Sequence, residues 1–451
     1  MTVTHLVSWI FTAILTHIAR KFMDDLFRSF TTEPTADIRS PSSSDEGGEI
    51  KEVPARELRN DDEEYEKFRL GNALTYMRES FQNWPFQVMV TATLAVDTFY
   101  LMSGLLTFYL AAPRFGTVQE SCQPRIWFWF IHAVHRFLRL TPPYLLVMFI
   151  YAGLFLHLYD GPLFPQRIEL TDVNYCRQHW WIIYFSNFFY TKEQCLPWTW
   201  YLANEFQFSV FLAPVFITVM KWNPRVGVMF AVLLLTSSTA STFGIVYMND
   251  SLQGHLTATS FESILVKPYT HWGTYTIGLL LGWILLQRKQ HGMLPRNSRR
   301  EQLIVGSALA LVSSFCLSSF YGLGGATNTT EPHSLSKFTS ALYTALSRPA
   351  FALEVAIVIY LCATDNAPHI NALLSWSGFR LPSQLTYGLF LIHPIYVYLI
   401  LLRFQTPITL SSVTLVILFL AVSVLSFISS FFLFLVTEIP VRTVEQFYGR
   451  R

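Results

Sequence analysis

Residues 88–111 read VMVTATLAVDTFYLMSGLLTFYLA, a run with one charged side chain, Asp97. An α-helix needs about 20 mostly apolar residues to cross the ~30 Å hydrocarbon core of a bilayer, and this stretch is long enough. Similar runs recur toward the C-terminus, and spans are expected at 141–158, 200–220, 226–248, 271–288, 301–321, 344–363, 385–403 and 411–436. The sequence therefore predicts an all-α polytopic membrane protein, a transmembrane helical bundle of about nine or ten spans.

The composition is also that of a membrane protein. Hydrophobic residues make up 52% of the 451 positions and charged residues only 14%, whereas soluble globular domains carry about 25% charged residues. Membrane lipids are therefore expected partners. A net charge of +2 gives no reason to expect nucleic acid. Five scattered cysteines are too few for a metal framework, so we expect no metal site.

Two apolar segments do not fit a simple span. Residues 126–140, IWFWFIHAVHRFLRL, carry four basic side chains at helical spacing: His132, His135, Arg136 and Arg139. A cationic face suits a helix that lies in the membrane interface, and Pro142-Pro143 is expected to break it before the next span. Residues 178–190, QHWWIIYFSNFFY, are too short to cross and rich in aromatic side chains, which predicts an interfacial or re-entrant segment.

The N-terminal part differs from the rest. Residues 1–30 contain a modest apolar segment near the lower length limit for a span, which we interpret as a short span or an anchor. Residues 31–70 are acidic and carry Ser, Pro and Gly, so they cannot bury enough apolar area to offset chain entropy and are predicted to form a disordered linker. The membrane domain is expected over 71–445, followed by a short cytoplasmic tail at 446–451.

Loop charges predict the orientation of the spans, because Lys and Arg near helix ends favour the cytoplasm. Basic residues occupy alternate loops: Arg114, Arg125, Lys221, Arg225, Arg288, Lys289, Arg296, Arg299, Arg300, Arg442, Arg450 and Arg451. The intervening loops carry N-glycosylation sequons at Asn249 and Asn328, which are used only on the lumenal side. Cys176 and Cys195 fall on that side, where a disulfide could persist. We expect an integral multi-pass protein of the endoplasmic reticulum or plasma membrane.

Polar groups inside spans are energetically expensive and are the first candidates for function. Arg136 and Arg139, one turn apart at a cytoplasmic interface with His135 beside them, suit phosphate oxygens. Contact with lipid head groups would use the same physics. Asp97 is interpreted either as a packing carboxylate or as a functional group. His393 precedes a proline, and it is either a partner for the backbone near that kink or an acid/base group.

Residues 195–208, CLPWTWYLANEFQF, bring polar groups to the lumenal mouth of a span. An aromatic belt explains Trp200 and Tyr201, but it does not explain three neighbouring polar residues: Asn204, Glu205 and Gln207. Lys267 enters the next pair of spans at the same end. Ser103-Gly104 is interpreted as a helix-contact or kink site, because small residues let membrane helices approach closely.

Seven motifs occur in one order along the chain: VDTFYLMSGLL, HRFLRLTPPY, CRQHWWIIYFSNFFY, CLPWTWYLANEFQF, KPYTHWGTYTIGLLLGW, LTYGLFLIHP and EIPVRTVEQ. In this order they resemble membrane acyltransferase family 3, most closely its animal branch, the nose resistant to fluoxetine proteins. The resemblance covers 71–445. It implies transfer of an acyl group from cytoplasmic acyl-CoA, a co-substrate, to a hydroxyl acceptor on a lipid or other small molecule, with no bound cofactor.

The resemblance also implies roles for individual residues. Arg136 and Arg139, with His135, would engage the donor phosphates. Transfer to a hydroxyl needs a base for its proton and donors for the oxyanion, and the candidate catalytic residues are Asp97, Glu205 and His393. Substrate-binding roles are expected for five more residues: Trp200, Tyr201, Asn204, Gln207 and Lys267.

The pattern departs from the family at its first core helix. A typical member has an apolar span that ends in the histidine base before a loop like GNALTYMRESFQNWPFQ, whereas here the acidic linker runs straight into Gly71. Loop charges raise a related conflict, because 88–111 must begin on the lumenal side while Arg20 and Lys21 place the linker in the cytoplasm if 3–20 spans. Either 3–20 does not span with that orientation, or a helix between the linker and Gln87 is absent. The alternatives are an inactive lipid-binding scaffold or a non-enzymatic lipid or drug transporter.

Overall fold

The computed structural model describes residues 93–118, 125–155, 171–179, 183–190, 194–248, 261–292, 336–402, 409, 411–441 and 443, with isolated positions between 303 and 314. All regular structure in these ranges is helical. Within the described ranges, seven helical stretches are long and apolar enough to cross a membrane: Leu94–Phe115, Ile126–Leu154, Pro197–Trp222, Pro224–Met248, Lys337–Ala363, Ser377–Leu401 and Ser412–Val441. The predicted all-α polytopic architecture is confirmed.

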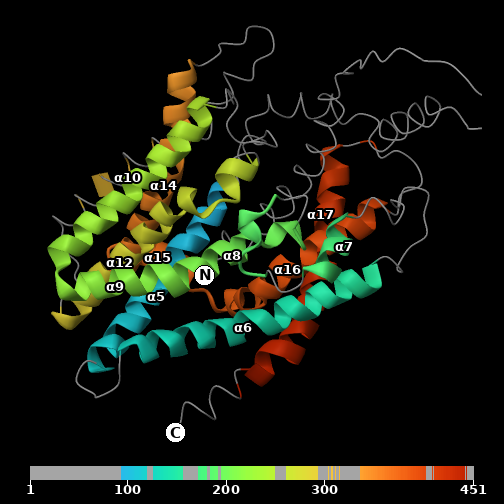
Figure 1. Ribbon diagram of the computed structural model, residues 1–451, viewed down its shortest axis with the longest axis horizontal. Helices are drawn as coiled ribbons and strands as arrows, with labels where there is room; N and C mark the ends of the chain where they lie inside the picture. Colours follow the sequence, from blue (N-terminus) through green and yellow to red (C-terminus); the bar gives the residue numbers. More distant parts are fainter. Residues whose placement is uncertain are drawn as a thin grey trace, which may run out of the picture.

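Five helices form a first group: α5 (Leu94–Val118), α9 (Ala213–Trp222), α10 (Pro224–Met248), α12 (Trp272–Gln290) and α14 (Lys337–Ala363). Each packs against at least two of the others, and Figure 1 shows them gathered on one side of the molecule. Their buried side chains form two apolar cores, one among α5, α9, α10 and α12 and the other among α5, α12 and α14. α5 and α12 contribute to both cores and are the centre of the group.

Glycines bring α5 and α12 into close contact. A Cβ atom added to Gly278 would overlap the backbone oxygen of Leu101, and one added to Gly282 would lie 2.7 Å from the backbone oxygen of Leu105. From the other helix, a Cβ on Gly104 would overlap a backbone oxygen of α12. Small residues allow membrane helices to pack backbone to backbone, where dispersion contacts stabilise the pair. The helix-contact interpretation therefore holds for Gly104.

A second group contains α6 (Arg125–Leu154), α16 (Arg380–Leu402) and α17 (Ser412–Leu433), which continues into a π-helical turn at Phe434–Glu438. α6 contacts both α5 and α16, and in Figure 1 it runs crosswise along the lower part of the molecule, past both groups. At about 1.5 Å per residue, a helix of 30 residues is about 45 Å long, which allows it to reach both. A short helix, α15 (Pro368–Leu374), precedes α16.

The prediction that Pro142-Pro143 breaks the chain between an interfacial helix and a separate span at 141–158 is wrong. Both prolines lie inside α6, which is continuous. Membrane helices tolerate proline where neighbouring helices supply hydrogen bonds to the backbone. Close before the pair, the hydroxyl of Tyr387 in α16 donates to the backbone oxygen of Leu140 at 2.6 Å. α16 thus supports α6 directly before the proline pair.

The other predicted spans have helical counterparts wherever the structure describes them, and α12 occupies the predicted 271–288. The predicted interfacial stretch at 178–190 follows α7 (Thr171–Gln178) and contains a short 3₁₀ turn, Ser186–Phe188. Several predictions fall outside the described residues: the N-terminal segment, the acidic linker, the absent first core helix, most of the span at 301–321, the sequons at Asn249 and Asn328, and the tail at 446–451.

Candidate functional site

Glu205 lies at the centre of a polar cluster that joins α5, α6 and α8 (Trp200–Gln207). α8 continues into α9 through a π-helical turn at Phe208–Leu212, a geometry that often accompanies functional sites. Glu205 is only 5% exposed. Ser103 Oγ donates to Glu205 Oε1 at 2.6 Å, and Arg136 Nη1 forms an ion pair with the same oxygen. Glu205 Oε2 is buried and has no hydrogen-bond partner among the described residues.

Arg136 connects this cluster to one more hydroxyl group, that of Thr107, and contacts Ser103 a second time. Its Nη2 donates to Thr107 Oγ1 at 2.9 Å and to Ser103 Oγ at 3.3 Å. The hydroxyl of Tyr275 donates to Thr107 Oγ1 at 3.5 Å, so α12 also reaches the cluster. We call these five residues, Ser103, Thr107, Arg136, Glu205 and Tyr275, the Glu205 cluster. It places a carboxylate, a guanidinium and three hydroxyls in one partly accessible region.

The structure separates the two arginines that were predicted to act together. Arg136 turns into the Glu205 cluster, with 21% of its side chain exposed, whereas Arg139 and His135 are exposed on α6. Side chains three positions apart differ by about 60° around a helix of 3.6 residues per turn, which is enough to place one inside and the other at the surface. Arg139 and His135, but not Arg136, are therefore presented outward.

The neighbouring polar residues of α8 hold the segment 183–190. Asn187 Nδ2 donates to Asn204 Oδ1 at 2.6 Å and to Gln207 Oε1 at 3.1 Å. Lys267 Nζ donates to the backbone oxygen of Asn187 at 3.0 Å. Asn204, Gln207 and Lys267 thus act together to dock this segment against α8. Their predicted substrate-binding roles stay predictions.

A second polar cluster joins α5, α12 and α14. Asp97, His271 and Arg348 are 0%, 0% and 2% exposed. Asp97 Oδ1 lies 2.9 Å from His271 Nδ1, and Arg348 Nη1 donates to Asp97 Oδ2 at 3.1 Å. The other ring nitrogen of His271 lies 2.8 Å from the backbone oxygen of Leu265. Both ring nitrogens are engaged and all three side chains are enclosed, so this triad ties three helices together.

Aromatic rings pack between the triad and α8. The Tyr100 ring lies 5.0 Å from the His271 ring and 4.7 Å from the Tyr201 ring, measured between centroids. Trp200 stacks on His271 at 5.9 Å with an interplanar angle of 25°. Trp200 is only 6% exposed, so the aromatic-belt explanation is wrong for this residue. It packs inside the protein, against the ring of the buried His271.

His393 lies in α16 and is 5% exposed. Its Nδ1 lies 2.9 Å from the backbone oxygen of Leu389, one turn earlier in the same helix. Of the two interpretations of this histidine, the geometry matches the partner of the backbone near a proline. The ring of Phe390 lies near both the His393 ring, at 6.4 Å, and the Tyr201 ring, at 5.8 Å.

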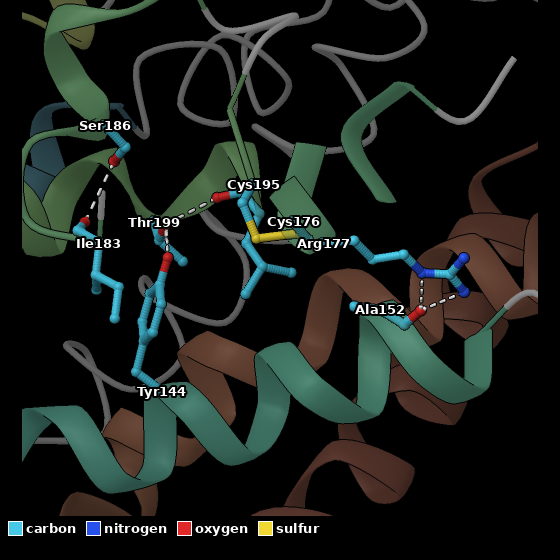
Figure 2. The surroundings of a disulfide bond; sticks show 9 residues. Tyr144, Ala152, Cys176, Arg177, Ile183, Ser186, Cys195 and Thr199 are labelled. Atoms are coloured by element: carbon cyan, nitrogen blue, oxygen red, sulfur yellow. Dashed lines mark hydrogen bonds between the residues drawn. A yellow bond between two sulfur atoms is a disulfide. The ribbon is translucent and has the colours of Figure 1, made fainter. Parts of the chain in front are cut away.

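A disulfide between Cys176 and Cys195 holds the turn that leads into α8, and this is the pair that the sequence suggested. Figure 2 shows the bond next to two further attachments to α6. Arg177 donates through Nε and Nη2 to the backbone oxygen of Ala152 at 3.1 and 3.0 Å. The Tyr144 hydroxyl lies 3.1 Å from Thr199 Oγ1. α8, and with it Glu205, is therefore positioned at its start by α6 and α7.

Residues 71–435 match the family model described as Acyltransferase domain, which is that of acyltransferase family 3. The chain belongs to this family. Over 386 residues it is 28% identical to nose resistant to fluoxetine protein 6 of Caenorhabditis elegans, covering 80% of this chain and 45% of that protein. Over 390 residues it is 26% identical to regulator of hypoxia-inducible factor 1 of the same organism, covering 81% and 71%. The chain thus spans about half the length of the first relative, and no solved structure matches.

Sequence reasoning missed several members of the two clusters. Ser103 was assigned to helix contact together with its neighbouring glycine, although its side chain points to Glu205. Arg348 was not singled out, although an arginine inside an apolar span is a functional candidate by itself. Thr107 and Tyr275 carry no signal in the sequence, because single hydroxyl residues are common in membrane helices.

Proposed function

We propose that this chain is a membrane-bound acyltransferase that moves an acyl group from acyl-CoA to a hydroxyl acceptor. Membership of acyltransferase family 3 supports acyl transfer in general. The observation that carries the proposal for this chain is the carboxylate of Glu205. One of its oxygens is held by Ser103 and Arg136, and the other is buried and unpartnered among the described residues. An oriented, unoccupied acceptor atom is what a general base requires.

In the proposed reaction Glu205 accepts the proton of the attacking hydroxyl as that oxygen bonds to the thioester carbonyl carbon. The carbon–sulfur bond then breaks, and the proton passes to the departing sulfur of CoA. Arg136 lies directly beside the carboxylate, so its guanidinium is placed to stabilise the negative charge that develops on the carbonyl oxygen. Glu205 would thereby perform the proton transfer that the family resemblance assigns to a histidine.

The donor phosphates are assigned to the exposed side of α6. Arg139 and His135 are exposed there, close in sequence to Arg136. A guanidinium offers several donors in a fixed plane that matches phosphate oxygens. Arg136 already forms an ion pair with Glu205 and hydrogen bonds with Ser103 and Thr107. We therefore assign it to the reacting end of the donor and not to its phosphates.

The test uses the full chain in lipid nanodiscs with acetyl-CoA or palmitoyl-CoA and measures the release of CoA thiol with lipid and sterol alcohols as acceptors. Glu205→Gln is expected to lower kcat by about 100-fold or more with little change in KM, because a lost general base acts on the chemical step. Arg139→Ala is expected to raise KM for acyl-CoA. Glu354→Gln removes a carboxylate of α14 outside the cluster and is the matched control.

Two results would contradict the proposal. Normal turnover by Glu205→Gln would remove the base assignment. No CoA release from the wild-type chain with any acceptor would favour the non-enzymatic alternatives. Lipid flux through liposomes in the absence of acyl-CoA would then indicate a transporter, and lipid binding without flux would indicate a scaffold.

A further inference from the structure

We propose that Ser103 is the nucleophile of the site and carries the acyl group as a serine ester between donor and acceptor. The inference rests on the proposed acyl transfer and divides its single displacement into two steps, with Ser103 as the attacking hydroxyl in the first. The reaction is then a double displacement, in which the hydroxyl of Ser103 is the first acceptor of the acyl group. The acceptor alcohol is then acylated by the protein and not directly by acyl-CoA.

The first observation is the hydrogen bond that Ser103 makes. Three other helical serines donate to the backbone of their own helix, Ser209 to Phe206, Ser237 to Leu234 and Ser383 to Arg380. This is the usual arrangement for serine inside a helix, where the backbone one turn earlier is the nearest acceptor. Ser238 and Ser430 donate to a backbone oxygen of a neighbouring segment, Thr270 and Leu385. Ser103 instead donates to the carboxylate of Glu205, 102 positions away, at 2.6 Å. That contact has no role in forming α5.

The second observation is that Arg136 contacts both members of the pair formed by Ser103 and Glu205. An activated nucleophile is recognised by a base within about 2.6–3.2 Å that is itself oriented by a third group. Glu205 is the base, and Arg136 orients it through an ion pair on the same oxygen that receives the serine hydroxyl. Arg136 Nη2 also donates to Ser103 Oγ at 3.3 Å. This second contact stabilises the negative charge that grows on Oγ as its proton moves to the carboxylate.

The third observation is accessibility. Thr107, which also bonds Arg136, is buried, and Asp97 of the same helix is fully enclosed, but Ser103 is half-buried. Ser103 lies near the middle of α5, which extends from Leu94 to Val118. An acyl group held there is near the middle of a span. A donor and an acceptor that approach from opposite ends of α5 could therefore use it in turn.

The chemistry balances without a further reactant. Ser103 Oγ bonds to the thioester carbonyl carbon, the carbon–sulfur bond breaks, and the serine proton passes through Glu205 to the CoA sulfur. In the second half, the oxygen of the acceptor alcohol bonds to the same carbon and the bond to Oγ breaks. The alcohol proton returns through Glu205 to Ser103. The products are free CoA, an acylated alcohol and the unmodified protein.

The experiment traps the intermediate. The full chain in nanodiscs is incubated with radiolabelled acetyl-CoA without an acceptor alcohol, quenched in acid, digested and analysed by mass spectrometry. The wild-type chain is expected to carry one acetyl group on the peptide that contains Ser103, and an added alcohol should remove it. Ser103→Ala should carry none, and Ser103→Cys should carry a thioester that neutral hydroxylamine cleaves. Ser209→Ala, which removes a serine hydroxyl bonded to its own helix, should label as wild type.

The outcomes separate this inference from the proposed function. CoA release with an acceptor but no labelled protein, or normal turnover by Ser103→Ala, overturns the serine ester and leaves acyl transfer standing. No CoA release under any condition overturns both. If Ser103→Ala fails to elute as a monodisperse protein, the hydroxylamine-sensitive label on Ser103→Cys decides the question, and its absence counts against the nucleophile.

Discussion

Asp97 and Arg348 are expected to stabilise the fold as a pair and to destabilise it when either stands alone. Their charged groups are 3.1 Å apart and almost fully buried. Replacing one partner by an apolar residue leaves the other charge without compensation, which costs about 3–5 kcal/mol. Replacing both removes the uncompensated charge, so the double variant should recover much of that loss. Asp97→Leu and Arg348→Met are the single variants, because each roughly conserves the volume of the side chain.

The assay is a double-mutant cycle, with the free energy of unfolding measured by titration of the detergent-solubilised chain with sodium dodecyl sulfate. We expect a coupling energy of about 3 kcal/mol between the two sites, at the upper end for residues in contact. Arg380→Met is the matched control, because Arg380 is exposed at the start of α16; its effect should stay within about 0.5 kcal/mol. If the double variant lost the sum of the two single losses, the pairing argument would be refuted.

Three further predictions concern packing and loop positioning. Gly278→Ala should abolish a monodisperse elution profile, because its methyl group would overlap the backbone of α5, whereas Gly244→Ala, with nothing within 4 Å, should behave as wild type. Replacing Cys176 and Cys195 by Ser should lower the free energy of unfolding by about 3 kcal/mol, since the bond closes a loop with a sequence separation of 19; equal stability of the reduced and oxidised proteins would contradict this. Lys267→Met removes the charged donor that bonds the backbone of Asn187 in the segment 183–190, and it should lower the free energy of unfolding by about 2 kcal/mol. Faster hydrogen exchange in that segment is the direct measurement.

The two clusters differ in the expected role of their residues, which is to stabilise the fold in one cluster and to take part in the reaction in the other. Asp97 and His271 are enclosed and fully engaged with protein groups, so their substitution should affect stability before activity. Glu205 has an oxygen without a hydrogen-bond partner in the part of the chain that the structure describes, and the hydroxyl of Ser103 is half-buried, so conservative substitutions there should affect activity first. Asp97 and Glu205 were both predicted to be catalytic candidates, and our proposal assigns the catalytic role to Glu205.

The sequence alone determined the membrane class, most of the spans and the family. Hydropathy is summed along the chain, and spans of about 20 residues are recognised without any knowledge of their neighbours. The sequence also drew attention to the motif 195–208, whose three polar residues Asn204, Glu205 and Gln207 all make side-chain hydrogen bonds in the structure. The pair Cys176 and Cys195 was suggested by its lumenal location, and the structure joins it.

Only the tertiary structure decided which polar groups meet. Asp97 contacts Arg348 across 251 positions and His271 across 174, and Ser103 contacts Glu205 across 102. Tertiary packing also kept α6 continuous through two prolines and turned Arg136 inward while Arg139 stayed exposed. Hydropathy depends on each residue's own side chain, but a buried charge is stable only beside a partner on another helix, and that partner is set by how the helices pack.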